Sequence, residues 1–150
     1  MGAFRRTQTA SSIDGRAREL LEARNFCHVT TLRADGTAHV VCVWVDTDGE
    51  YVILNSAEGR AWVRNLESDP RVVCTVQNRE NPSEYVSVRG HLVELTYDGA
   101  EEHIDSMALK YNGVPGFRGH EPGRRRVLLR IAPERIFLRP GVTRARRATR

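Results

Sequence analysis

The chain has 150 residues and a formal net charge of +4. This length fits one domain whose core is large enough to fold without disulfides or metals. The longest apolar run, residues 40–45, is too short to cross a bilayer. Because the N-terminal residues also lack the apolar segment of a secretory signal, we expect a cytoplasmic protein that does not bind membranes.

The positive charge lies at the two ends of the chain. Seven arginines and no acidic residue occur in residues 1–12 and 139–150, whereas residues 13–138 carry 16 basic and 19 acidic side chains, a net charge of −3. We therefore predict a flexible tail at 1–12, a domain at 13–140 and a flexible basic tail at 141–150. The basic tail has no interleaved aromatic residue for base stacking, so we do not expect nucleic acid as a partner.

The first half of the domain predicts one helix followed by three strands. Apolar residues at helical spacing indicate a short amphipathic helix over 13–24, with Ser12 as its N-cap. Asp-Gly pairs at 35–36 and 48–49, each flanked by β-branched residues, predict hairpin turns. The strands, expected to form an antiparallel meander, are 26–32, 38–45 and 50–56.

The second half predicts two more helices and four more strands. A helix over 59–68 is expected to end before Asp69-Pro70, and a helix over 100–111 carries an apolar stripe. Gly90 predicts a bulge or bend within the strand 84–95. The other strands are 71–77, 124–132 and 135–139, the last two separated by Pro133. These elements predict a mainly β fold with α additions, a small barrel of six to seven antiparallel strands with short flanking helices.

Few residues have the spacing of a catalytic or metal site. The five histidines are scattered, and the sequence contains no paired-cysteine, GxSxG or P-loop motif, so we predict no metal site and assign no catalytic residue. The three cysteines, Cys27, Cys42 and Cys74, each lie in an apolar β-like run. We expect all three to be buried and reduced.

Residues 55–72, NSAEGRAWVRNLESDPRV, are the most informative segment. They predict a strand that leads through a glycine into a helix whose first turns carry Arg60 and Arg64. A helix N-terminus with nearby arginines suits a phosphate group. In the alternative interpretation, these arginines lie on a surface helix and pair with Glu58 and Glu67.

Five segments of the chain carry a family resemblance. They are ELLEARNFCHVTTLRADGTAHVVCVWV, GRAWVRNLESDPRV, EYVSVRGHLVELT, AEEHIDSMALKYNGVP and RRRVLLRIAPERIFL, which together extend from about residue 13 to residue 140. In this order they resemble the pyridoxamine 5'-phosphate oxidase-like proteins, the FMN-binding split β-barrel superfamily. Within it the chain looks most like the actinobacterial branch that uses coenzyme F420, an 8-hydroxy-5-deazaflavin.

The resemblance implies that a cofactor lies in a groove at a homodimer interface. The residues that would hold its phosphate end are Arg60, Ala61, Arg64 and Asn65. The strand before them would line the ring and side chain through Asn55, Ser56 and Ala57. The first hairpin would flank the deazaflavin through Thr30, Thr31, Val41, Cys42 and Val43. Residues that match positions approaching the cofactor, from the same or the second subunit, are Val76, Gln77 and Tyr85.

Two positions differ from the pattern of the family. Trp62 stands where many relatives have lysine; it offers an N–H group and a π face to the cofactor but no charge, so anion binding must depend on Arg60, Arg64 and backbone donors. Val41 and Cys42 stand where relatives tend to have Ser-Pro beside the ring.

The activity implied by the resemblance is hydride transfer from C5 of reduced coenzyme F420 to a small electron-poor organic acceptor. The proton donor stays open between Tyr85, Ser87 and water, and we expect the glycine-rich loop 113–123 to shape the substrate pocket. An FMN-dependent oxidoreductase on the same barrel and a non-catalytic binding protein are the alternatives.

Overall fold

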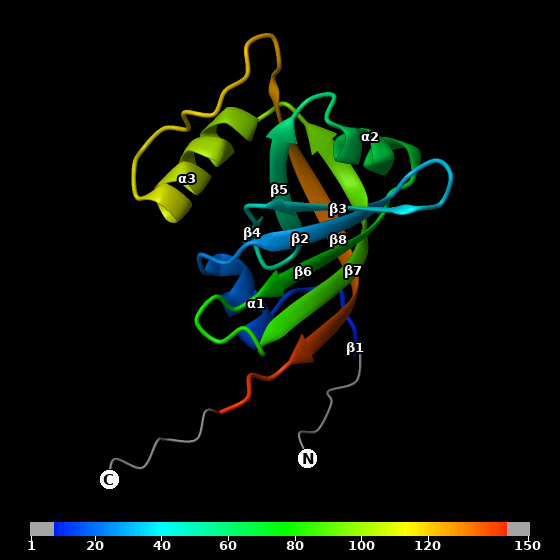
Figure 1. Ribbon diagram of the computed structural model, residues 1–150, viewed down its shortest axis with the longest axis vertical. Helices are drawn as coiled ribbons and strands as arrows, with labels where there is room; N and C mark the ends of the chain where they lie inside the picture. Colours follow the sequence, from blue (N-terminus) through cyan, green and yellow to red (C-terminus); the bar gives the residue numbers. More distant parts are fainter. Residues whose placement is uncertain (1–7, 144–150) are drawn as a thin grey trace.

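An antiparallel sheet of eight strands makes up most of the protein, whose residues 8–143 are described by a computed structural model (Figure 1). The six long strands are β2 (Cys27–Leu32), β3 (Ala38–Val43), β5 (Val52–Ala57), β6 (Arg71–Gln77), β7 (Tyr85–Thr96) and β8 (Arg126–Arg139). Two strands of two residues, β1 (Gln8–Thr9) and β4 (Asp46–Thr47), complete the sheet. This architecture confirms the predicted mainly β split barrel with flanking helices.

The sheet curls because its two ends are close in sequence. The strand order is β3-β2-β6-β7-β8-β5-β4, and β1 pairs with β8 outside this path. Since β3 and β4 are separated only by residues 44 and 45, the two edges of the sheet must approach each other. The concave side of the curled sheet encloses the main apolar core, which includes Val29, Leu54, Val88 and Leu129.

Strand β8 is continuous, whereas the sequence predicted two strands separated by Pro133. Pro133 faces Gly90 of β7 in a register that shifts between Arg89 and Gly90, which confirms the predicted irregularity at this glycine. On its other side, β8 pairs with β5 up to Ile131 and with β1 from Arg135 onwards. Pro133, which has no N–H group, therefore lies where that second ladder is interrupted, and the strand continues through it.

The predicted meander of three strands is wrong. Strand β5 pairs with β8 and with the short β4, and β3 pairs only with β2. The apolar run that predicted one strand over 38–45 leaves the sheet after Val43, because both backbone polar groups of Val45 bond to helix α3 (Ala100–Asn112). The Val45 N–H donates to the Tyr111 hydroxyl at 3.1 Å, and the Lys110 ammonium donates to the Val45 carbonyl at 2.7 Å.

The three helices lie close to the predicted positions. Helix α1 (Gly15–Glu22) buries Ala17, Leu20 and Leu21, and its N-cap is Asp14. Ser12 was predicted as the cap, but its hydroxyl instead donates to the Asp14 carboxylate at 2.8 Å. Helix α2 (Ala61–Ser68) begins two residues after the predicted start and ends before Pro70, as predicted.

Helix α3 has the predicted apolar stripe, with Ile104, Met107, Ala108 and Tyr111 buried. It lies beside β8 and β5 (Figure 1), and its Lys110 ammonium donates to the Leu21 carbonyl of α1 at 3.0 Å. Among residues 8–143, no helix is long and apolar enough to span a membrane.

The predicted tails fall mostly outside the described residues. Residues 1–7 and 144–150, which include the arginine-rich C-terminus, are not described. Gln8 and Thr9 pair with Ile136 and Arg135 of β8, so the sheet begins before residue 13.

Candidate functional site

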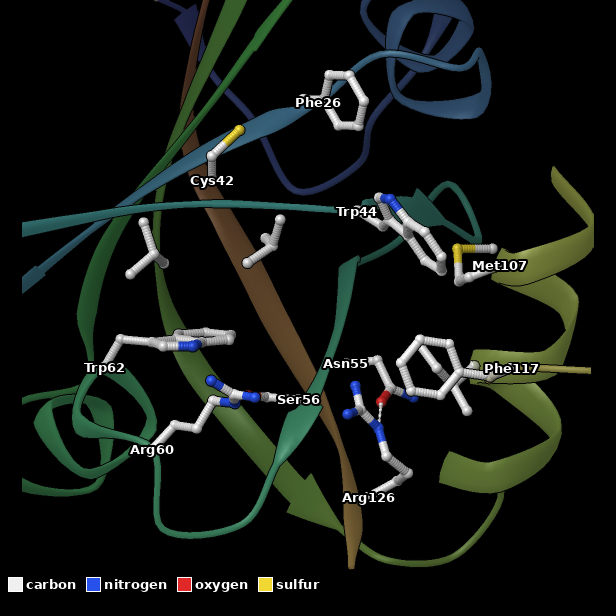
Figure 2. A pocket seen from close by; sticks show the side chains of 13 residues that line it. Phe26, Cys42, Trp44, Asn55, Ser56, Arg60, Trp62, Met107, Phe117 and Arg126 are labelled. Atoms are coloured by element: carbon white, nitrogen blue, oxygen red, sulfur yellow. Dashed lines mark hydrogen bonds between the residues drawn. The ribbon is translucent and has the colours of Figure 1, made fainter. Parts of the chain in front are cut away.

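A groove of about 690 Å³ lies between helix α2 on one side and helix α3 with the loop 113–123 on the other (Figure 2). Strand β3 crosses over it, and β5 and the start of β8 form its floor (Figure 2). The residues that line it are Phe26, Val41, Cys42, Val43, Trp44, Asn55, Ser56, Arg60, Trp62, Ile104, Met107, Phe117 and Arg126.

The α2 side of the groove is a strand–turn–helix segment that leaves backbone donors without a cap. Gly59 has φ of +78°, a left-handed conformation that glycine adopts without strain, and it turns β5 into α2. The N-cap residue is Arg60, which makes no side-chain capping bond, and the first turn contains no acidic residue. The first N–H groups of α2 and the positive end of the helix dipole are thus free to attract an anion.

Arg60 forms an ion pair with Glu121 of the loop 113–123. Neither Glu58 nor Glu67 is its partner, in contrast to the alternative interpretation from sequence; Glu58 instead bonds to Tyr97 and Arg125. The Glu121 carboxylate therefore bonds to the Arg60 guanidinium, which was predicted to hold the cofactor phosphate. The Arg60 and Glu121 side chains are 44% and 39% exposed, so the ion pair lies at the mouth of the groove.

Arg126 is the second cation of the groove, and it is 8% exposed. Its Nε donates to Asn55 Oδ1 at 2.9 Å, and its guanidinium carbon lies 4.9 Å from the centroid of the Phe117 ring. Burial, together with the neighbouring Arg60 cation, lowers the pKa of Arg126 below its usual value. Among residues 8–143 no carboxylate forms an ion pair with it.

Asn55 is oriented by α3. Its amide nitrogen lies 2.8 Å from the Ala100 carbonyl oxygen, to which it donates, and 3.1 Å from His103 Nδ1. The amide oxygen is therefore left to accept from Arg126. His103 Nε2 is buried without a hydrogen-bond partner in the described part of the chain and lies 3.6 Å from an Asp46 carboxylate oxygen.

The Asp46 carboxylate lies on the far side of His103 from Asn55 and is charged. Burial works to raise the pKa of Asp46, but His103, the Thr47 N–H group and the Lys110 ammonium outweigh that effect and lower it. Asn55 and His103 thus separate the Asp46 anion from the Arg126 cation.

Aromatic side chains form the α3 side of the groove. The Trp44 ring stacks on Tyr111 with centroids 5.0 Å apart and meets the Phe117 ring edge-on at 5.9 Å. The Phe117 N–H donates to the Asp105 carboxylate of α3 at 2.8 Å, which fixes this part of the loop to the helix. With Met107 beside them, the Trp44 and Phe117 rings make an apolar wall opposite the α2 side (Figure 2).

The groove brings together part of the residue set that the family resemblance implied. Arg60, Trp62, Asn55 and Ser56 line it, as do the β3 residues Val41, Cys42 and Val43. Ala61 and Arg64 are exposed on α2, and Ala57 is buried at the end of β5.

The side chain of Asn65 bonds to residues of β2 and β3 and does not line the groove. Its amide nitrogen donates to the hydroxyl of the buried Thr31 at 3.1 Å and lies 3.2 Å from His39 Nδ1. These contacts attach α2 to β2, so Asn65 and Thr31 support the helix from behind.

Four other residues of the implied set lie on β2, β6 and β7, and none of them lines the groove of this chain. Thr30 is partly buried on β2, and Val76 is fully buried in the core. The Gln77 amide donates to the Pro82 carbonyl at 2.8 Å, and the Tyr85 ring packs against Phe137 with centroids 5.9 Å apart.

The cysteine prediction is wrong for one of the three. Cys27 and Cys74 are buried, but Cys42 is exposed, and its sulfur points away from Arg60 and Trp62, toward the Phe26 side of β3 (Figure 2). In β3, an edge strand, alternate side chains point away from the core, and Cys42 occupies an outward position between Val41 and Val43. No group of three or more metal-ligating side chains occurs within residues 8–143.

Sequence analysis did not single out five lining residues, namely Phe26, Trp44, Ile104, Met107 and Arg126. For Arg126 a signal existed: three consecutive arginines, 124–126, lie at the start of the predicted strand 124–132, and at least one of three successive strand residues must point inward. The other four were correctly placed on apolar elements, but nothing local indicated that those elements meet at a groove.

The curled sheet, with a groove that carries two cations and an aromatic wall, defines a split β-barrel protein of the flavin-binding type. Residues 13–139 match the pyridoxamine 5'-phosphate oxidase family, and the chain belongs to this family. No curated protein matches the chain with significance.

Solved structures share the fold. An F420 reductase is 26% identical with a TM-score of 0.72, and the match covers 83% of this chain and 98% of that chain. A conserved hypothetical protein from Mycobacterium tuberculosis is 19% identical with a TM-score of 0.67, over 95% and 99% of the two chains. General Stress Protein 26 from Bacillus anthracis is 16% identical with a TM-score of 0.63, over 83% and 91%.

Proposed function

We propose that the protein is a homodimeric oxidoreductase that uses coenzyme F420, of the actinobacterial type, and reduces a small electron-poor organic acceptor. The observation that carries this proposal is the groove itself. It combines an uncapped helix start bearing Arg60 with an apolar, aromatic wall, and it occurs on a barrel similar to that of an F420 reductase.

The donor set fits the phosphate end of such a cofactor. The first N–H groups of α2 have no side-chain cap, and Arg60 has as its partner the partly exposed carboxylate of Glu121, which an anion can displace. The indole of Trp62 lies beside Arg60 in the groove (Figure 2). Val41 and Val43 of β3 are apolar neighbours for a ring. When bound, reduced coenzyme F420 supplies a hydride from its C5 to an electron-poor double bond, and one proton completes the two-electron reduction.

The residues of the chain bind the ligands, orient them and exclude water. Arg60 holds an anion at the mouth, and the Trp44 and Phe117 rings keep the interior apolar, so that the reacting groups are held together away from solvent. Tyr85 and Ser87 lie on β7 and do not line the groove of this chain. Because the mouth of the groove at Arg60 and Glu121 is partly exposed, a single water molecule that enters there is our proposed proton donor.

Strand β3 supports the proposed dimer. It is an edge strand, and its outward face exposes Val40 at 57%. An exposed, apolar edge next to the groove is the kind of surface that a second subunit covers. Sedimentation at micromolar concentration tests this, and a monomer would contradict the shared groove.

Titration of the purified protein with coenzyme F420 and, separately, with FMN tests the cofactor. Quenching of deazaflavin fluorescence at low micromolar concentration supports the proposal, whereas binding of FMN alone assigns the same groove to an FMN-dependent enzyme. Trp62 and Cys42 are the residues that favour a non-catalytic binding protein, and failure of both cofactors to bind would exclude both enzymes.

A further inference from the structure

Arg126 is a buried cation whose charge is not balanced within the groove. The side chain is 8% exposed, and its one polar partner among the described residues is the neutral amide oxygen of Asn55. A buried guanidinium without a carboxylate is unusual, because removing a charge from water costs free energy unless another charge or several hydrogen bonds compensate. Burial and the Arg60 cation both oppose the charge of Arg126, and the carboxylates of Glu101 and Glu121, neither of which forms an ion pair with Arg126, offset only part of that effect, because the pKa of Arg126 is still lowered.

The geometry of Arg126 leaves a defined set of donors for a ligand. Asn55 occupies Nε, so the two terminal nitrogens are free, and they point into the groove (Figure 2). Two parallel N–H groups on one guanidinium match the two oxygens of a carboxylate. Because Asn55 is itself held by Ala100 and His103, the guanidinium is oriented before any ligand arrives.

The surroundings of these donors favour an apolar ligand body, and the electron-poor double bond of the proposed acceptor makes that body planar where it is conjugated to a carboxylate. The Phe117 ring lies against the guanidinium, and the Trp44 ring meets Phe117 edge-on. Met107 and Ile104 of α3 complete this end of the groove. It lies on the side opposite Arg60 and the start of α2, where the proposed cofactor phosphate is held.

We infer that Arg126 binds the carboxylate of the molecule that is reduced, so that the substrate is a small, planar, conjugated carboxylic acid. This inference rests on the proposed function, because it assigns the α2 side of the groove to the cofactor and the α3 side to the acceptor. Arg60 and Arg126 then bind two different anions, one from each ligand.

The test uses cinnamate, a planar unsaturated carboxylate, and cinnamamide, its neutral analogue of nearly the same shape. Isothermal titration of the full chain, with and without saturating oxidised coenzyme F420, gives the dissociation constant of each probe. For the wild type we expect cinnamate to bind about tenfold more tightly than cinnamamide, as one bidentate charged contact would provide.

Two neighbouring arginines provide a matched pair of variants. Arg126→Met is expected to remove the preference for cinnamate and to leave cinnamamide binding nearly unchanged. Arg125→Met removes an exposed arginine that bonds to Glu58 outside the groove, and it should keep the full preference. Arg126→Lys retains the charge and should keep part of the preference, which decides the matter if Arg126→Met does not fold.

Equal binding of the two probes to the wild type would overturn the inference, and so would an unchanged preference for cinnamate in Arg126→Met. A loss of coenzyme F420 affinity in Arg126→Met as large as its loss of cinnamate affinity would also overturn it, because Arg126 would then bind an anion of the cofactor. Failure of coenzyme F420 to bind the wild type would instead refute the proposed function. The comparison of cinnamate with cinnamamide on the cofactor-free protein would then still decide the role of Arg126.

Discussion

The ion pair between Arg60 and Glu121 makes a quantitative prediction about cofactor affinity. An anion that binds Arg60 competes with the Glu121 carboxylate, which bonds to one terminal nitrogen of that guanidinium. Both side chains are partly exposed, and exposed ion pairs contribute about 0.2–1 kcal/mol. Glu121→Gln removes this competing interaction, so the dissociation constant of coenzyme F420 should fall by about 1.4- to 5-fold.

The same reasoning predicts the opposite effect at Arg60. Arg60→Ala should weaken coenzyme F420 binding by about tenfold, the loss expected for one charge-assisted contact. In the double variant the Glu121→Gln gain should disappear, because Glu121 acts by competing for Arg60 and interacting residues are not additive. The wild type, the two single variants and the double variant form a double-mutant cycle. Arg124, 3.6 Å from Glu121, is present in all four of these proteins, so the cycle isolates the contribution of Arg60.

Quenching of deazaflavin fluorescence, measured for the four proteins at one ionic strength, provides the affinities. Glu67→Gln is the matched control: it removes one negative charge from the exposed surface of α2 without touching Arg60. Equal tightening in Glu67→Gln would mean that the effect is one of general charge. A Glu121→Gln gain that persists in the Arg60→Ala background would refute the competition.

The remaining predictions concern stability and thiol exposure. Gly90→Ala should cost about 2 kcal/mol or more in urea denaturation, because a Cβ there would lie 2.0 Å from the Ala132 carbonyl oxygen; an unchanged midpoint would contradict the close approach. Tyr111→Phe should cost about 1–3 kcal/mol, since the buried Val45 N–H loses its acceptor. Burial raises the pKa of Tyr111 to about 12, so its contribution to the free energy of unfolding is complete below pH 10 and should be lost between about pH 10 and 12 relative to Tyr111→Phe. Ellman's reagent should titrate three thiols after unfolding and only Cys42 in the native protein, more slowly at concentrations where the proposed dimer covers the outward face of β3; rapid reaction of Cys27 or Cys74 in the native protein would refute their burial.

Local sequence patterns were sufficient wherever a single element determines its own structure. The spacing of Ile104, Met107 and Tyr111 predicted α3 and its buried face, and Gly90 predicted the irregular register of β7. The pattern failed at Val45. An apolar residue after a β-branched run looks like one more strand position, and only the distant side chains of Tyr111 and Lys110 remove its backbone groups from the sheet.

The same distinction applies to the groove. Arg60, Trp62, Asn55 and Ser56 lie within one short segment, so a family resemblance in that segment could indicate them together. Arg126 lies 71 positions from Asn55, to which it bonds, and no spacing rule relates the two. A groove lined by strands from distant parts of the chain is defined by sheet topology, which the predicted meander had wrong.

Asn55 explains why the two cations of the groove differ. An amide can present its oxygen or its nitrogen, and the hydrogen-bond partners determine which. The Ala100 carbonyl accepts only from nitrogen, so the amide oxygen of Asn55 must face Arg126, and His103 Nδ1 must then be an acceptor with its proton on Nε2. Arg60, by contrast, has a partly exposed carboxylate as its partner at the surface. The chain thus neutralises the cation at the mouth with a group that a ligand can displace, and it leaves the interior cation oriented but without an ion-pair partner.

An anion that displaces Glu121 exchanges one ion-pair partner of Arg60 for another, whereas an anion that reaches Arg126 supplies an ion-pair partner that the protein lacks there. The interior position should therefore discriminate more strongly between charged and neutral ligands than the mouth does.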